Sequence, residues 1–230
     1  MQCERIRTDI CASAAQDYRY LLSRAYPAKS ALEFVGNHFQ LRREERDFLF
    51  RAVCSPERAL ERRAKAVSVE DLRGSRLIVD GYNCFITLES ALRGRSLIIG
   101  DDGFVRDVAR VFRKFRPTEY TRQAYRLMES LLSCYPPDDT IIFLDAKMSA
   151  SGELACRVNR WGTGGQMHIR CITVRCAEKR LAALKGIKAS ADSVIIDGAD
   201  RVFDLAGYII INRLRSAPLR LPVDERHGVS

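Results

Sequence analysis

The sequence predicts an α/β protein, with a doubly wound, mainly parallel sheet preceded by a small all-α N-terminal domain. Two observations support this. Apolar residues recur at helical spacing through residues 1–66. From Arg76 onward, short apolar runs that end in glycine or acidic residues alternate with amphipathic stretches. Strands that alternate with helices are typical of a parallel sheet covered on both faces. We therefore expect two domains, residues 1–66 and 67–230.

The first domain is expected to contain three helices and a connector. An apolar stripe over residues 14–25 predicts the first helix, which Pro27 ends. The segment Ser30–Glu33 has the pattern of a capping box and predicts the start of the second helix. A further stripe over residues 41–52 predicts the third, and the charged segment 56–66 predicts a connector helix.

Helices two and three could form a helix-turn-helix that contacts nucleic acid. The arginines expected at that contact are Arg42, Arg43 and Arg46. The alternative is a helical packing module whose arginines are merely solvated. The residues alone leave both interpretations open.

Four apolar runs predict strands of the parallel sheet: residues 77–79, 97–99, 140–144 and 168–174. Helical stripes are expected at residues 105–115 and 120–131. In such sheets the ligand site lies beyond the carboxyl ends of the strands. The functional site is therefore expected at the carboxyl edge of the predicted sheet.

Composition excludes several classes of protein. The chain has 230 residues, of which 47% are hydrophobic and 29% charged, with a net charge of +9. These values do not fit a disordered, collagen-like or disulfide-stapled chain, and no apolar run approaches the ~20 residues of a membrane span. The eight cysteines lack metal-ligand spacing and are expected to be reduced, which indicates a cytoplasmic protein. The positive charge favours a polyanionic partner.

Aspartates follow the predicted strands. Carboxylates at neighbouring strand ends raise one another's pKa values, and a bound divalent cation would relieve that repulsion. Oxygen ligands suit Mg²⁺ or Mn²⁺. The predicted ligands are Asp80, Asp101, Asp102, Asp145 and Asp192. The alternative is that each aspartate only caps a turn or a helix.

The motif Leu-Ile-Val-Asp-Gly-Tyr-Asn at residues 77–83 resembles the opening strand of the PIN/NYN-like metal-dependent nuclease superfamily. That resemblance implies a PIN-like second domain, a metal-holding role for Asp80 and a supporting role for Asn83. Asp145 and Asp192 are similar to further acidic positions of the superfamily, so the catalytic set is expected to be Asp80, Asn83, Asp145 and Asp192. On the predicted helix 119–133, Glu129 is the acidic candidate.

The whole chain also resembles an uncharacterised prokaryotic family. That family couples a short helical N-terminal domain of unknown function to a PIN-like C-terminal domain. The matching stretches are residues 26–30, 39–50, 79–89, 101–107, 145–153 and 189–207.

These observations lead to one main hypothesis, a metal-dependent endonuclease that hydrolyses phosphodiester bonds in RNA, with DNA as the alternative substrate. Backbone phosphates are expected to contact the polar face of the predicted helix 105–115, formed by Arg106, Arg110, Arg113 and Lys114. The competing hypotheses are a non-catalytic nucleic-acid-binding regulatory protein and a nucleotide phosphohydrolase. No membrane partner is expected, and the oligomeric state, including a homo-oligomer, is left open.

Overall fold

Chain contacts divide the protein into two units. The computed structural model describes residues 6–108, 115–162 and 169–222. A helix-rich unit contains residues 1–64, 97–108 and 218–230, and a parallel-sheet unit contains residues 65–96 and 109–217. The first division falls next to the expected boundary at residue 66. The helix-rich unit, however, also takes two later segments of the chain.

The helix-rich unit holds four helices and a small sheet. The helices are α1 (Thr8–Ser23), α2 (Ala28–His38), α3 (Arg43–Ala52) and α4 (Pro56–Ala64). The strands are β2 (Leu97–Ile99), β3 (Val105–Asp107) and β8 (Leu219–Arg220), in the order β3-β2-β8. One apolar core joins these pieces, because Ile98 and Leu221 are buried in the same cluster as Tyr18, Phe48 and Leu49.

The predicted helices of this unit are confirmed, except for the start of α2. That helix begins at Ala28, directly after Pro27, so Ser30 lies inside its first turn and is not a cap. Pro27 has φ −57° and ψ 127°, and its carbonyl already accepts the Ala31 amide at 2.9 Å. The proline therefore starts the helix three residues earlier than the capping-box pattern predicts.

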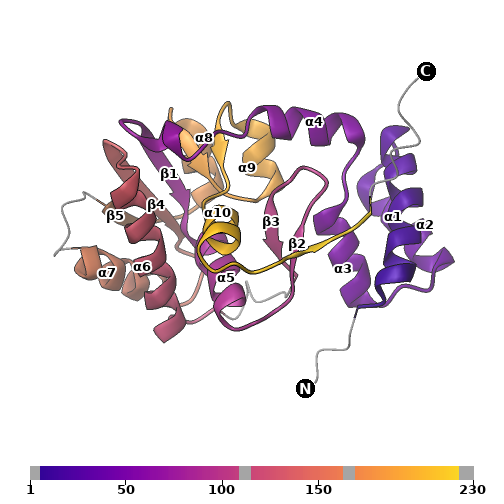
Figure 1. The fold of residues 1–230 in the computed structure, drawn as a ribbon, viewed down its shortest axis with the longest axis horizontal. Coiled ribbons are helices and arrows are strands. Elements are labelled where there is room, and N and C mark those ends of the chain that lie inside the picture. The colour runs from indigo at the N-terminus through magenta and orange to yellow at the C-terminus, as the bar shows by residue number, and fades with distance from the viewer. Residues whose placement is uncertain (1–5, 109–114, 163–168, 223–230) are drawn as a thin grey trace. The chain divides into compact units, whose positions relative to one another are not determined.

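The parallel-sheet unit contains five strands in the order β5-β4-β1-β6-β7, and every pairing is parallel (Figure 1). The strands are β1 (Arg76–Asp80), β4 (Asp139–Asp145), β5 (Ile169–Val174), β6 (Ile187–Ala189) and β7 (Val202–Phe203). The helices are α5 (Gly81–Leu92), α6 (Glu119–Cys134), α7 (Ser151–Gly162), α8 (Ala177–Ala183), α9 (Ser193–Gly198) and α10 (Leu205–Asn212), with a short 3₁₀ turn, η1 (Glu70–Leu72). The predicted α/β fold class is confirmed.

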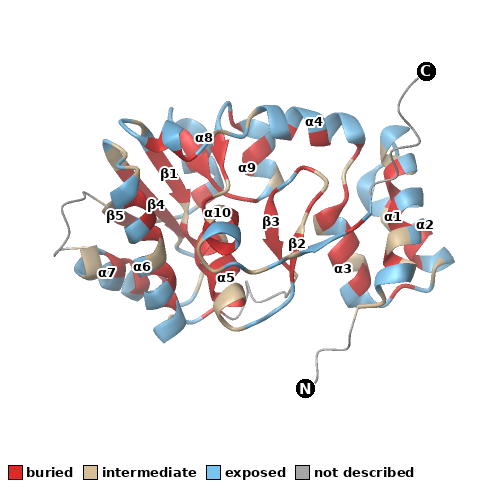
Figure 2. Ribbon diagram, in the orientation of Figure 1, coloured by how far each residue is buried: buried red, intermediate tan, exposed pale blue. Residues whose placement is uncertain are grey.

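The central strands β1 and β4 are buried along almost their whole length (Figure 2). From β1 the chain moves outward through β4 to β5, then crosses to β6 on the other side of β1 and continues to β7. The direction of winding therefore reverses between β1 and β6. Such a switch point is where open α/β sheets commonly bind ligands.

Residues 97–107 differ from the prediction. The run 97–99 is not a strand of the parallel sheet, because β2 pairs antiparallel with β3, with Leu97 opposite Asp107. Residues 105–107, expected to begin a helix, form β3 instead. The turn between the strands contains Gly103 at φ 87°, and Gly100 N donates to Phe104 O at 3.0 Å. A glycine at positive φ closes such a hairpin without steric cost.

No helix in the described part of the chain is long and apolar enough to cross a membrane.

Candidate active site at the carboxyl edge of the parallel sheet

Asp80 ends β1 at the switch point of the sheet. One of its carboxylate oxygens accepts the Asn83 amide at 3.3 Å, and the other accepts the Ser190 hydroxyl at 3.1 Å. Asp80 is thus the N-cap of α5. The helix starts directly against β4, since a Cβ on Gly81 would lie 2.6 Å from Leu144 Cδ2. The carboxylate is therefore fixed at the point where strand and helix meet.

The loop after β6 is tied to the same place. Asn83 Oδ1 accepts the Ala191 amide at 2.9 Å, and Ser190 Oγ accepts the Asp192 amide at 3.1 Å. The D-G-x-N motif thus holds the loop that carries Asp192 through Asn83 bound to Ala191 and Asp80 bound to Ser190, and the Ser190–Asp192 bond is internal to that loop. The expected supporting role of Asn83 therefore has a geometric basis.

Strand register places further side chains beside Asp80. Val79 pairs with Ala189, and Ala189 pairs with Phe203, so Asp80, Ser190 and Asp204 follow at one level of three neighbouring strands. Asp80 itself pairs with Phe143. Asp145 lies two residues beyond Phe143, about 7 Å further in the strand direction, and alternation turns it to the same face.

The pKa of Asp80 agrees with the proximity of these carboxylates. The pKa of Asp80 is raised to about 7, first because the carboxylate is buried and then because the carboxylates of Asp192 and Asp145 are close. The hydrogen bonds from Asn83 and Ser190 favour the ionised form but do not outweigh burial. Burial also raises the pKa of the Cys84 thiol, and the negative charges of Asp80 and Asp204 add to that rise. The carboxylates of one edge therefore act on one another.

Capping explains part of each aspartate's position. Asp192, which is exposed, accepts the Val194 amide at 2.8 Å as the N-cap of α9. Asp145 accepts the Lys147 amide at 2.9 Å. Asp204 accepts the Gly207 amide at 2.9 Å as the N-cap of α10. A local structural role is compatible with a chemical one, because each cap also holds its carboxylate at the sheet edge.

The donor set limits which metal site these residues can form. Among the residues that the structure describes, no three His, Cys, Asp or Glu side chains form a group that could hold a metal ion. A cage made by protein ligands alone is therefore not supported. Mg²⁺ commonly binds through one or two carboxylates and completes its octahedron with water and substrate phosphate oxygens. Asp80 with one neighbouring carboxylate fits that kind of site.

Asp101 and Asp102, which were also predicted to be metal ligands, belong to the helix-rich unit and are neutralised by arginines. Arg19 donates to both oxygens of Asp101, at 2.8 and 2.7 Å. Asp102 is buried and receives two bonds of 2.7 Å from Arg106 and one of 3.0 Å from Arg62. Burial would raise the pKa of Asp102, but these arginines lower it below its usual value. The prediction of metal ligation by these two residues is therefore wrong.

Of the four residues predicted to contact phosphates from residues 105–115, the structure describes only Arg106. Arg106 is buried and paired with Asp102, so its predicted contact with phosphate is wrong. Arg110, Arg113 and Lys114 lie outside the described residues.

In the helix-rich unit, Arg42 and Arg43 are exposed at the start of α3. Arg46 instead donates to Leu41 O at 3.0 Å and to Asn37 Oδ1 at 2.9 Å, which ties α3 to the end of α2.

Sequence reasoning missed Ser190 and Asp204 at this edge. Asp204 follows β7, which has only two residues and no periodicity to read. The signal for Ser190 is its place beside Asp192 in Ser-Ala-Asp-Ser. Glu129, the acidic candidate on α6, accepts the Tyr125 hydroxyl at 3.2 Å.

Comparison with known proteins places the chain in a family. Residues 69–208, more than half of the chain, match the model of a domain of unknown function, DUF5616. The chain belongs to the DUF5616 family. Residues 12–65 match a second model, the protein of unknown function DUF434. The expected N-terminal domain of unknown function is confirmed. The segment expected to be PIN-like matches a second domain of unknown function, which contains Asp80, Asn83, Asp145, Asp192 and Asp204.

A relative within the curated proteins supports the same assignment. The chain is 31% identical over 183 residues to the uncharacterized protein MJ0935 of Methanocaldococcus jannaschii, which covers 80% of this chain and 87% of that protein. No solved structure matches the chain.

Proposed function

We propose that the protein is a metal-dependent endonuclease that hydrolyses phosphodiester bonds in RNA at the carboxyl edge of the parallel sheet. The observation that best supports this function is Asp80, with a pKa raised to about 7 beside Asp192 and Asp145. Strongly perturbed carboxylates at a sheet switch point favour a functional site over a purely structural one. The resemblance of residues 77–83 to the nuclease motif points to the same chemistry.

A Mg²⁺ or Mn²⁺ ion would be held by Asp80 together with Asp145 or Asp192. When bound, such an ion lowers the pKa of a bound water and neutralises charge on the phosphate. The residues of the chain supply the arrangement. Ser190 and Asn83 hold the Asp80 carboxylate and the loop that carries Asp192, so both keep their positions when substrate approaches.

In the proposed reaction, water attacks phosphorus and the bond from phosphorus to the 3′ oxygen breaks. The products are a 5′-phosphate and a 3′-hydroxyl, and the leaving oxygen takes up a proton. Asp80 is assigned to metal binding in this reaction, and a bound cation would keep its carboxylate ionised despite its burial.

The cysteines support an intracellular setting for this activity. The seven cysteines that the structure describes are all free thiols. We therefore place the proposed function in the reducing cytoplasm.

The direct test is cleavage of labelled single-stranded and structured RNA in Mn²⁺, Mg²⁺ or EDTA. We expect cleavage that requires metal and that falls by at least about 100-fold in Asp80→Asn, since several kcal/mol of charge stabilisation are removed. Asp139→Asn is the matched control, because Asp139 begins β4 at the opposite edge and pairs there with Arg76 and Arg170. Equal cleavage by both variants would contradict the proposal.

A non-catalytic nucleic-acid-binding protein is the second candidate. The finding that favours it is that the described residues offer no three-ligand metal group. Binding of RNA without cleavage in any metal would support this candidate. Release of phosphate from free nucleotides alone would instead support a nucleotide phosphohydrolase.

A further inference from the structure

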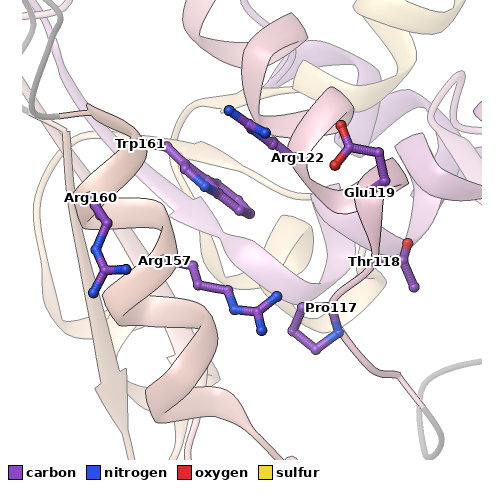
Figure 3. A pocket seen from close by; sticks show the side chains of 7 residues that line it. All are labelled: Pro117, Thr118, Glu119, Arg122, Arg157, Arg160 and Trp161. Atoms are coloured by element: carbon purple, nitrogen blue, oxygen red, sulfur yellow. The ribbon is translucent and has the colours of Figure 1, made fainter.

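A depression of about 590 Å³ lies between the first turn of α6 and the outer face of α7, within the parallel-sheet unit (Figure 3). Its chemistry differs from that of the acidic edge, because it combines basic and aromatic side chains. The lining residues are Pro117, Thr118, Glu119, Arg122, Arg157, Arg160 and Trp161.

Helix α7 presents this surface because of its apolar pattern. Leu154, Ala155 and Val158 are buried, and Arg157 and Trp161, four residues apart, lie together beside this buried stripe. In Figure 3 both project from α7 toward the first turn of α6, whereas Arg160 is turned away from that turn.

Trp161 packs against an aromatic ring on α6. Its indole contacts the Tyr125 ring at a centroid distance of 5.6 Å, and the residue stays partly exposed. The next residue, Gly162, allows this approach, because a Cβ there would lie 2.8 Å from the Tyr125 hydroxyl oxygen. A flat aromatic surface is thus fixed in place and remains accessible to a ligand.

Positive charge dominates the depression. Three guanidinium groups line it against the single carboxylate of Glu119. Arg157 also pairs with Glu153, but both side chains are about half exposed, at 46% and 57%. Such an exposed pair is weak and exchanges readily for another anion.

We propose that this depression binds a segment of single-stranded RNA, with a base stacked on Trp161 and backbone phosphates against Arg122 and Arg157. The inference rests on the proposed nuclease function for its choice of RNA. A basic groove combined with an aromatic stacking surface is the usual means of binding single strands without sequence preference. Bases within a duplex are already stacked and cannot reach an indole in this way.

The depression is connected to the acidic edge through packed side chains. Tyr82, two residues after Asp80, contacts Phe115 at a ring centroid distance of 5.5 Å. Phe115 lies only two residues before Pro117, which lines the depression. The chain segment that leads into the depression is thereby packed against the start of α5, the helix that Asp80 caps.

The chain provides its own reporter, because Trp161 is its single tryptophan. In EDTA and low salt, a single-stranded RNA of about 12 nucleotides, within the usual range of single-strand sites, should quench the indole fluorescence in a saturable way. A blunt duplex of the same length should not. Absence of quenching by the single strand, or equal quenching by the duplex, would overturn the inference.

Variants test base stacking and phosphate contact separately, with affinity measured by the fluorescence anisotropy of labelled RNA. Trp161→Ala should weaken binding by about 5- to 100-fold, the range found for loss of one stacked base, whereas Trp161→Phe keeps a ring and should lose less. Arg122→Ala/Arg157→Ala does not disturb the core and should reduce the slope of log K against log salt by about 1.4, since each phosphate contact on a single strand contributes about 0.7.

The matched control is Lys179→Ala/Arg180→Ala, which removes the same charge from exposed positions on α8. An equal loss of slope in this control would show that only net charge matters and would refute a specific site. The outcome is separable from the nuclease proposal. Quenching without any cleavage in metal contradicts the nuclease function alone, whereas metal-dependent cleavage without quenching contradicts the binding site alone.

Discussion

Two groups of aspartates follow short apolar strands in this chain, and their surroundings are opposite. In the helix-rich unit, Asp101 and Asp102 each receive paired bonds from arginine, and the pKa of Asp102 is lowered. In the parallel-sheet unit, Asp80 lies beside other carboxylates and its pKa is raised to about 7. The same local pattern thus produces a structural ion pair in one unit and a group of neighbouring carboxylates in the other.

The largest effect on stability is expected at Asp102, whose charge is neutralised by arginines. Asp102→Asn removes the buried negative charge that pairs with Arg62 and Arg106, and this should lower the free energy of unfolding by about 3–5 kcal/mol. Urea denaturation followed by circular dichroism measures it. A loss below about 1 kcal/mol would mean that Asp102 is not the anchor of this cluster.

Substitution of Asp80 is expected to raise the free energy of unfolding, in contrast to substitution of Asp102. Its folded pKa is about 7 against 3.8 for the unfolded chain, so the stability it provides is present below pH 4 and is lost as pH rises to 7. Asp80→Asn removes this dependence. The free energy of unfolding of the variant should exceed that of the wild type by an amount that grows from pH 4 to pH 7 and then stays constant at roughly 4 kcal/mol. A difference that does not change with pH would contradict the raised pKa.

In the wild type, a divalent metal ion should offset part of the destabilisation that Asp80 causes at neutral pH. At 100 times its dissociation constant, Mg²⁺ or Mn²⁺ should stabilise the wild type by about 2.7 kcal/mol at pH 8, measured as a rise in melting temperature. Asp80→Asn should respond much less, and Asp139→Asn should respond as the wild type does. No shift in the wild type at millimolar metal would remove the metal from the proposed function.

The smallest effect on stability is expected at Asp204. Asparagine caps helices about as well as aspartate, so Asp204→Asn should change the free energy of unfolding by less than about 0.5 kcal/mol. If Asp204 belongs to the acidic edge, the same variant should still reduce the stabilisation by metal. A variant that keeps both its stability and the full metal response would assign Asp204 to capping alone.

Run length decided which parts of the sheet could be predicted. The strands at residues 76–80, 139–145 and 169–174 have five to seven residues and were identified from their apolar runs. Strands β6 and β7 have three and two residues and were not. A three-residue run such as Leu97–Ile99 is equally compatible with a parallel strand or a hairpin, and only the Gly-Asp-Asp-Gly turn after it favours the hairpin.

The candidate site was predictable to a similar degree. Asp80, Asn83, Asp145 and Asp192 were chosen because of position after a strand and a recognised motif, and the structure brings them to one edge of the sheet. What distinguishes Asp101 is Arg19, which lies 82 positions away in the chain. No local pattern indicates this partner of Asp101, whereas Arg106, a partner of Asp102, lies only four residues away but was assigned to phosphate contact.

The helix-rich unit is assembled from three separate stretches of the chain. A fragment ending near residue 66 would expose Arg19 and Arg62 without Asp101 and Asp102, and would lack Ile98 and Leu221 from its core. The DUF434 match, residues 12–65, is therefore not a portable module. During synthesis on the ribosome, the packing of these helices is completed only after Ile98 and Leu221 have been added to the chain.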